Sequence, residues 1–224
     1  MAFKTMEAVR KGKVKKGGFP DGVEERMHEL GVPDWYIESC RKIAYLFPKA
    51  HAVAYVMMAF RIAWFKVHHP LAFYSAYFYR RSQKDSFDAD CMIRGIDVVR
   101  KRIHDIQNNP DHSAKEDDLL TTLYAVYEFY LRGFDFAPIS FAESDALKFL
   151  PVGDKQLRPP FVSVSGLGET AANDLAAARA RGGGFVSLED VSAACPKVSQ
   201  THIDMLRALG AFGDMPETSQ MSLF

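Results

Sequence analysis

Residues 45–79 read YLFPKAHAVAYVMMAFRIAWFKVHHPLAFYSAYFY, and no other stretch of the chain mixes aromatic, small and basic residues so densely. From Ala50 onward no helix-breaking residue occurs before Pro70. Apolar side chains surround almost the whole helical wheel, which predicts a long helix buried on most of its faces. Basic residues interrupt this apolar surface at four positions: Lys49, His51, Arg61 and Lys66. Such groups are either ordinary surface positions or a site that receives phosphate.

The composition indicates a soluble globular protein. The 224 residues are 48% hydrophobic and 25% charged, enough for one large domain or two modest ones. Lys and Arg number 28, and Asp and Glu also number 28, so the formal net charge is zero. Any contact with nucleic acid must therefore come from local patches and backbone amides, because the chain has no overall positive field.

The cysteines and the chain start point to the cytoplasm. Cys40, Cys91 and Cys195 are far apart and lack the paired spacing of a zinc or dithiol site, which favours a reducing compartment. Adjacent histidines at 68 and 69 diverge by about 100° on a helix and do not share one ion. The N-terminus lacks a signal peptide's continuous apolar core. Residues 52–65 are too short and too interrupted to span a bilayer, so no membrane partner is expected.

Helical signals continue on both sides of the opening stretch. Gly31 and Gly133 are expected to end helices, and Ser113 with Glu116 has the capping-box pattern of a helix start. Asp88-Ala89-Asp90 is interpreted as a solvated helix start. The predicted helices cover residues 1–10, 23–30, 34–47, 50–69, 70–81, 87–106 and 113–132.

A cluster of basic residues precedes the flexible GGFPDG loop. Glu7 is the one acid that faces the six members, which are Lys4, Arg10, Lys11, Lys13, Lys15 and Lys16. The cluster is either a solvated helix end and linker or a patch that follows phosphates, and the residues alone leave both interpretations open.

The sequence pattern changes at Gly133 from long helical segments to short runs. The runs FDFAPISF, ALKFLPV and KQLRPPFVSV are short, contain prolines and are separated by turn signals, which predicts a small sheet or extended cap. Helix is expected to return at Glu169. The predicted fold is therefore mainly α, a helical domain followed by a small α+β domain, with a boundary near residue 133.

Residues 164–168 read VSGLG and precede the alanine-rich segment ETAANDLAAARA. The two glycines permit a tight turn, and residues 165–169 present backbone amides at the positive end of a helix. This resembles the hairpin of a helix-hairpin-helix motif, which grips a DNA phosphate through amides without reading sequence. The DNA-binding candidates in this hairpin are Ser165, Gly166, Leu167 and Gly168.

The segment that follows resembles the second half of a tandem helix-hairpin-helix unit. Helices are predicted from Ser187 and from Ser199, with a short Pro-Lys turn between them and LGAFGD as the closure. This turn has no glycine, so Lys197 and Ser199 would make any phosphate contact, and its role is otherwise structural. A DNA glycosylase shares the motif but needs a catalytic Lys or Asp, and none is placed here.

The chain ends in QMSLF, residues 220–224. A glutamine amide and two apolar anchors on a free tail suit insertion into a partner's pocket. Gln220, Leu223 and Phe224 resemble the sliding-clamp-binding pentapeptide of bacterial replication proteins. The alternative is an apolar end that packs on its own domain.

These motifs, in this order, resemble the C-terminal part of the bacterial DNA polymerase III alpha subunit, PolC type. The resemblance covers essentially the whole chain. It implies that residues 1–133 belong to a helical fingers domain and 134–214 to a duplex-binding domain with a tandem helix-hairpin-helix. Residues 215–224 would be a flexible clamp-binding tail.

The same resemblance implies a nucleotide site at the start of the long helix. Phe47 and Tyr55 would lie near the base and sugar of the incoming dNTP, with Lys49 and His51 near its triphosphate. This is physically sensible, because cationic groups stabilise transferring phosphates and aromatic rings stack on nucleosides. Arg10, Lys11 and Lys13 are further candidates for contact with template or nucleotide.

The resemblance also implies that catalysis depends on Mg²⁺ held by palm carboxylates that lie upstream of Met1. The chain alone is therefore predicted to be inactive, although it is part of a nucleotidyltransferase. A stand-alone, non-catalytic DNA-binding adaptor that recruits a sliding clamp is the alternative. A glycosylase-like enzyme would need a pocket for a flipped base.

Overall fold

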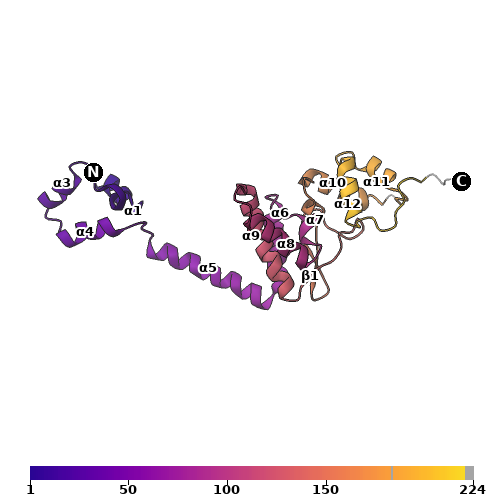
Figure 1. The fold of residues 1–224 in the computed structure, drawn as a ribbon, viewed down its shortest axis with the longest axis horizontal. Helices are drawn as coiled ribbons and strands as arrows, with labels where there is room; N and C mark the ends of the chain where they lie inside the picture. The colour runs from indigo at the N-terminus through magenta and orange to yellow at the C-terminus, as the bar shows by residue number, and fades with distance from the viewer. Residues whose placement is uncertain (183, 220–224) are drawn as a thin grey trace. The chain divides into compact units, whose positions relative to one another are not determined.

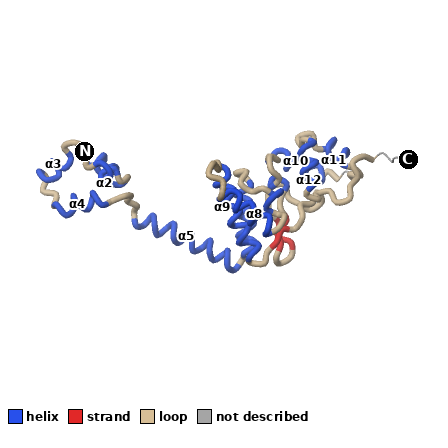
Figure 2. Tube along the Cα trace, in the orientation of Figure 1, coloured by secondary structure: helices blue, strands red, loops and turns tan. Residues whose placement is uncertain are grey.

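The computed structural model describes residues 1–182 and 184–219, and it confirms a mainly helical fold with a small sheet. The chain divides into two compact units, Met1–Ala63 and Trp64–Phe224. Figure 1 shows the order of the elements, and Figure 2 shows the strands in red among helices and loops.

The first unit contains short helices and the beginning of a long one. They are α1 (Ala2–Arg10), α2 (Lys13–Gly17), α3 (Val23–Glu29), α4 (Asp34–Lys42) and α5 (Lys49–His68), of which α5 continues into the second unit. Val9, Val14 and Cys40 form a small buried cluster. The predicted helix over 34–47 is too long, because the backbone is extended at Ile43, directly after α4.

The long helix α5 exists as predicted, but its predicted burial is wrong. None of its 20 residues is buried, and Phe60 is 74% exposed. An apolar surface on all sides of a helix indicates that burial is favourable, but it does not say which segment covers it. The helix is also longer than the interval 52–65. By length and composition alone it could cross a membrane, which is weak support for a span because core helices pass the same test.

The second unit opens with four helices: α6 (Pro70–Ser82), α7 (Ala89–Met92), α8 (Ile96–Gln107) and α9 (Ala114–Leu131). Pro70 occupies the first turn of α6, where its missing N–H costs nothing. Ser113 and Glu116 form the predicted capping box of α9. The single helix predicted over 87–106 is instead two helices, because Gly95 has a φ of 102° that a continuous helix does not permit.

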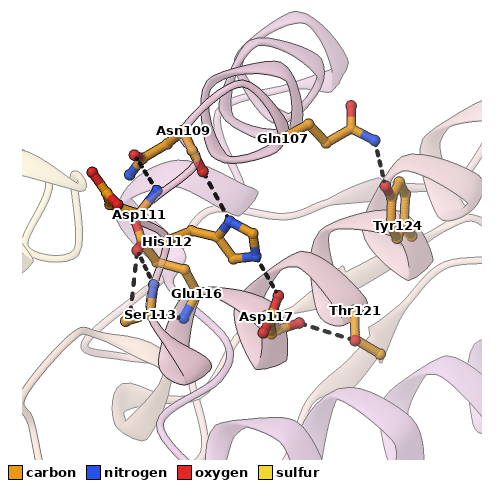
Figure 3. Close-up of polar contacts among 9 residues, drawn as sticks. All are labelled: Gln107, Asn109, Asp111, His112, Ser113, Glu116, Asp117, Thr121 and Tyr124. Atoms are coloured by element: carbon orange, nitrogen blue, oxygen red, sulfur yellow. Dashed lines mark hydrogen bonds and ion pairs between the residues drawn. The ribbon is translucent and has the colours of Figure 1, made fainter.

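The loop between α8 and α9 is closed by His112 (Figure 3). Its Nδ1 lies 2.9 Å from the carbonyl oxygen of Asn109, and its Nε2 lies 2.9 Å from a carboxylate oxygen of Asp117. These contacts raise the pKa of His112, mainly through the Asn109 carbonyl and then through the charge of Asp117. The loop is therefore held most firmly when His112 is protonated.

A three-stranded sheet follows the helices. The strands β1 (Asp135–Phe136), β2 (Leu150–Val152) and β3 (Gln156–Arg158) have the order β1-β3-β2, with β1 parallel and β2 antiparallel to β3. Phe136 and Phe149 pack against Phe78 of α6, so helices and sheet share one core. The division into compact units lies at Ala63, and a functional boundary near residue 133 stays a prediction.

The last helices are α10 (Glu169–Ala180), α11 (Leu188–Ala194) and α12 (Gln200–Ala208). Ser187 caps α11 in a capping box with Asp190, and Ser199 caps α12 through its hydroxyl. These starts confirm the helices predicted from Glu169, Ser187 and Ser199. The buried faces of the three helices belong to the same core as the sheet.

Candidate nucleic-acid interface

The first hairpin connects the 3-10 helix η1 (Phe161–Ser163) to α10. Leu167 is 2% exposed and anchors the turn in the core, while its neighbours Ser165, Gly166 and Gly168 are exposed. The turn closes through the Leu167 N–H, which donates to the Val164 carbonyl over 3.0 Å. Gly166 has a φ of 76°, a conformation that glycine adopts without steric cost. The sequence thus folds locally into an anchored turn with an exposed backbone.

This turn presents amides at the positive end of α10. Gly168 is the N-cap, and no side chain of the described residues caps the helix. The Ala172 N–H donates to the Gly168 carbonyl and is the first helical hydrogen bond of α10, so the N–H groups of residues 169–171 have no acceptor within the helix. Glu169 is an acid in this first turn, and the Gln83 amide lies 3.5 Å from its carboxylate. The arrangement suits an anion such as a phosphate.

The second hairpin differs because its backbone is already occupied. The Lys197 N–H donates to the Asp174 carboxylate over 3.1 Å, and the Cys195 thiol lies 3.9 Å from the Asp174 carbonyl. The Ser199 hydroxyl accepts the His202 N–H as a helix cap. The side chain of Lys197 remains exposed, so the predicted phosphate contacts of Lys197 and Ser199 stay predictions.

His202 lies beside the first hairpin and was missed in the sequence. A Cβ added to Gly166 would lie 3.4 Å from the Nε2 of His202, although the two residues are separated by 36 positions. The nearby Ser199 hydroxyl lies 2.8 Å from the Nδ1 of the same ring. Only tertiary packing brings α12 to this turn, and no local sequence signal indicates the contact.

Three of the four residues predicted to bind nucleotide form one aromatic row in the first unit, whereas Lys49 lines a separate hollow with Val53 and Met57 of α5. The rings of Phe47 and His51 are stacked, with centroids 5.1 Å apart and an interplanar angle of 4°. Tyr55 packs edge-on against His51 at 4.5 Å. Lys49 is the first residue of α5. Phe47 and Tyr55 are 54% and 67% exposed, so the aromatic faces are accessible.

The basic cluster lies next to this aromatic row. The Leu46 N–H donates to the Arg10 carbonyl over 2.9 Å, and the Arg10 guanidinium lies 5.8 Å from the centre of the Tyr45 ring. Arg10 and Lys11 both pair with Glu7, and their hydrogen bonds lower the pKa of Glu7 to about 2. Part of the cluster is thus neutralised internally. No ion pair of Lys13 is found among the described residues.

Within residues 1–182 and 184–219, no group of three or more His, Cys, Asp or Glu side chains is arranged to hold a metal ion. The predicted clamp-binding residues Gln220, Leu223 and Phe224 lie outside the described residues. Asp88 of the Asp-x-Asp sequence accepts the Asp90 N–H and caps α7, as expected of a helix start. Burial raises the pKa of Asp88, so this carboxylate is not fully solvated.

The fold and the exposed turn define a helix-hairpin-helix motif in the C-terminal part of this chain. Residues 133–221 match the helix-hairpin-helix motif family, which includes both hairpins described above.

The whole chain is also similar to part of DNA polymerase III PolC-type from several bacteria. It is 46% identical over 224 residues to the protein of Thermotoga maritima and 48% identical over 225 residues to those of Staphylococcus epidermidis and Bacillus cereus. All of this chain is aligned, but it spans only 16% of the first protein's length and 15% of the other two. The resemblance to the PolC-type subunit is confirmed, and the matched region is one part of those proteins.

Proposed function

We propose that this chain is a part of a PolC-type replicative DNA polymerase that holds primer-template duplex and positions the incoming dNTP. The observation that carries the proposal is the exposed turn of Ser165, Gly166 and Gly168 at the start of α10, in a chain whose whole length aligns with PolC-type polymerases. The sequence match supports a place in a DNA polymerase, and the turn offers backbone donors for a phosphate.

The duplex contact is made by the first hairpin. A chain without net charge has no long-range attraction for DNA, so fixed donors at one place are needed. Exposed amides at a helix start provide such donors for a phosphate oxygen. Phosphates are the same for every base sequence, so this grip is indifferent to sequence and weakens with salt.

The dNTP contact is made by the stacked aromatic row at the start of α5. The exposed rings of Phe47 and Tyr55 suit the base and sugar, and the imidazole of His51 in the same row suits the triphosphate. Lys49 is a further cation at the start of α5. Arg10 lies within reach of the same row through Tyr45.

Catalysis belongs to the rest of the polymerase. Mg²⁺ would supply Lewis-acid chemistry to the transferring phosphoryl group, and the described residues of this chain do not form a site for it. We therefore expect that the chain alone does not extend a primer.

The polymerase works in the cytoplasm, and the terminal QMSLF segment binds its sliding clamp.

The exposed apolar surface of α5 fits the same proposal. The PolC-type relatives are about six times longer than the matched region, so most of their structure lies outside it. A 20-residue helix with apolar side chains on all sides exposes apolar surface to water, and burial of that surface would be favourable. In the complete polymerase, other segments of the protein cover this helix.

Substitution of Gly168 by Asp tests the duplex contact. Gly168 has open space around its Cβ position and lies at the N-cap of α10, where aspartate is a favourable residue. The variant keeps or slightly raises stability, while its carboxylate occupies the amides and repels phosphate. We expect duplex affinity to fall by at least about tenfold, the loss of roughly one charged hydrogen bond.

Gly184→Asp is the matched control, because it adds the same charge at another exposed glycine with open space. Affinity is measured by fluorescence anisotropy with two labelled duplexes of unrelated sequence, at low and high salt. Equal affinity of Gly168→Asp and the unchanged chain would contradict the proposed grip, as would a strong preference for one duplex sequence.

A further inference from the structure

We propose that His202 of α12 donates a hydrogen bond to the same DNA phosphate that the first hairpin holds. This inference rests on the proposed duplex contact, and it assigns a role to the second half of the tandem unit. That half would serve the first hairpin instead of holding a phosphate of its own.

The position of the imidazole is the first argument. The His202 Nε2 lies 3.4 Å from the point where a Gly166 side chain would begin, so the ring edge borders the open side of the turn. Gly166 is exposed and His202 is half-buried, so the ring is held by its surroundings while one edge reaches solvent. An anion seated on the Gly166 side of the turn is within reach of this nitrogen.

The hydrogen-bond pattern of the ring is the second argument. The Ser199 hydroxyl accepts the backbone N–H of His202 over 3.3 Å, and it lies 2.8 Å from Nδ1. Its single hydrogen is then available for Nδ1, and when it is donated there the ring hydrogen of the neutral imidazole is on Nε2. A protonated imidazole carries a hydrogen on Nε2 as well. In both states the nitrogen at Gly166 is a donor, as a phosphate oxygen requires.

The occupied second hairpin is the third argument. Asp174 of α10 accepts the Lys197 N–H, so an acidic group of the chain already lies where a phosphate would bind this turn. A DNA phosphate there would meet a negative charge and lose an amide donor. The start of α12 therefore contributes to DNA contact through His202, which faces the first hairpin.

The test compares two replacements of similar size in the 224-residue chain. His202→Gln retains an N–H donor, whereas His202→Leu has none. We expect His202→Leu to weaken duplex binding roughly fivefold, the effect of one hydrogen bond, and His202→Gln to retain most of the affinity. The same anisotropy assay is used, and the thermal midpoint of each variant shows whether the fold is intact.

The outcomes separate this inference from the proposed function. If Gly168→Asp loses affinity but both His202 variants bind like the unchanged chain, the hairpin contact stands and the role of His202 is overturned. Equal losses in the Gln and Leu variants, with unchanged thermal midpoints, would also overturn it, because shape and not the donor would then matter. If Gly168→Asp binds normally, the duplex contact itself fails.

Discussion

The carboxylate of Asp174 accepts a hydrogen bond from the backbone N–H of Lys197 over 3.1 Å, which joins α10 to the turn between α11 and α12. The two hairpins of the tandem unit are therefore unequal. The first has an exposed backbone without a side-chain cap among the described residues, and the second is closed by a carboxylate of the chain itself. A phosphate and this carboxylate both need a backbone N–H donor of the turn, and Asp174 already accepts the one from Lys197.

Substitution of Asp174 by Ala should destabilise the second unit. The change removes the acceptor of the Lys197 N–H and should lower the free energy of unfolding by about 1 kcal/mol. Urea unfolding followed by circular dichroism measures this value. Asn173→Ala, at the exposed neighbouring position of α10, is the control and should change stability by less. Equal effects of the two substitutions would mean that the hydrogen bond contributes nothing.

The loop closed by His112 should make stability depend on pH. Contacts with Asn109 and Asp117 raise the folded-state pKa above the ordinary value of 6.5. The stabilisation is therefore fully present below that value and is lost as pH rises through the folded-state pKa. The stability difference between the unchanged chain and His112→Gln should be larger at about pH 5 than at about pH 9.

His104→Gln provides the control for this pH dependence, because His104 is exposed on the adjacent helix α8. A pH-independent difference for His112→Gln would show that the loop contacts do not depend on the charge of the ring.

Gly12→Ala should disturb the segment that leads to the aromatic row. A Cβ at Gly12 would lie 2.0 Å from the Ala44 carbonyl oxygen, so the backbone has to move. The hydrogen bond from the Leu46 N–H to Arg10 should open, and exchange of that amide hydrogen should become faster. Hydrogen exchange followed by NMR measures this rate.

Gly22→Ala is the matched control, because Gly22 has a similar φ of 71° at a helix N-cap but open space around its Cβ position. Both substitutions place a side chain in the left-handed region, at a cost of about 1 kcal/mol. Only Gly12→Ala adds the steric conflict. Unchanged exchange at Leu46 in Gly12→Ala would contradict the close approach to Ala44.

Replacement of both Leu223 and Phe224 by Ala should abolish binding to the sliding clamp. The two side chains are the apolar anchors of the terminal QMSLF segment, and alanine removes the surface that a pocket would bury. Surface plasmon resonance with immobilised clamp measures the affinity. Met221→Ala changes the same tail between Gln220 and the two anchors and should retain binding. If the double variant binds as well as the unchanged chain, the tail is not the clamp contact.

Local chemistry made several helix boundaries of this chain predictable. Ser113 and Glu116 specify a start, Pro70 fits only a first turn, and Gly133 adopts the positive φ that ends a helix. The VSGLG turn was predicted in the same way, because the backbone conformation that requires a glycine depends only on neighbouring residues. Gly95 shows the limit, since one glycine in an amphipathic pattern leaves open whether the helix bends, breaks or continues.

The sequence by itself determined the helices, the small sheet and the exposed turn, since each depends on residues a few positions apart. Tertiary structure alone decided which polar groups meet. It brought His202 to Gly166 and Asp174 to Lys197, and each of these contacts joins a helix to a distant turn, which no periodicity encodes. It also left α5 exposed, because an apolar pattern states that burial is favourable, and only a packed neighbour can provide it.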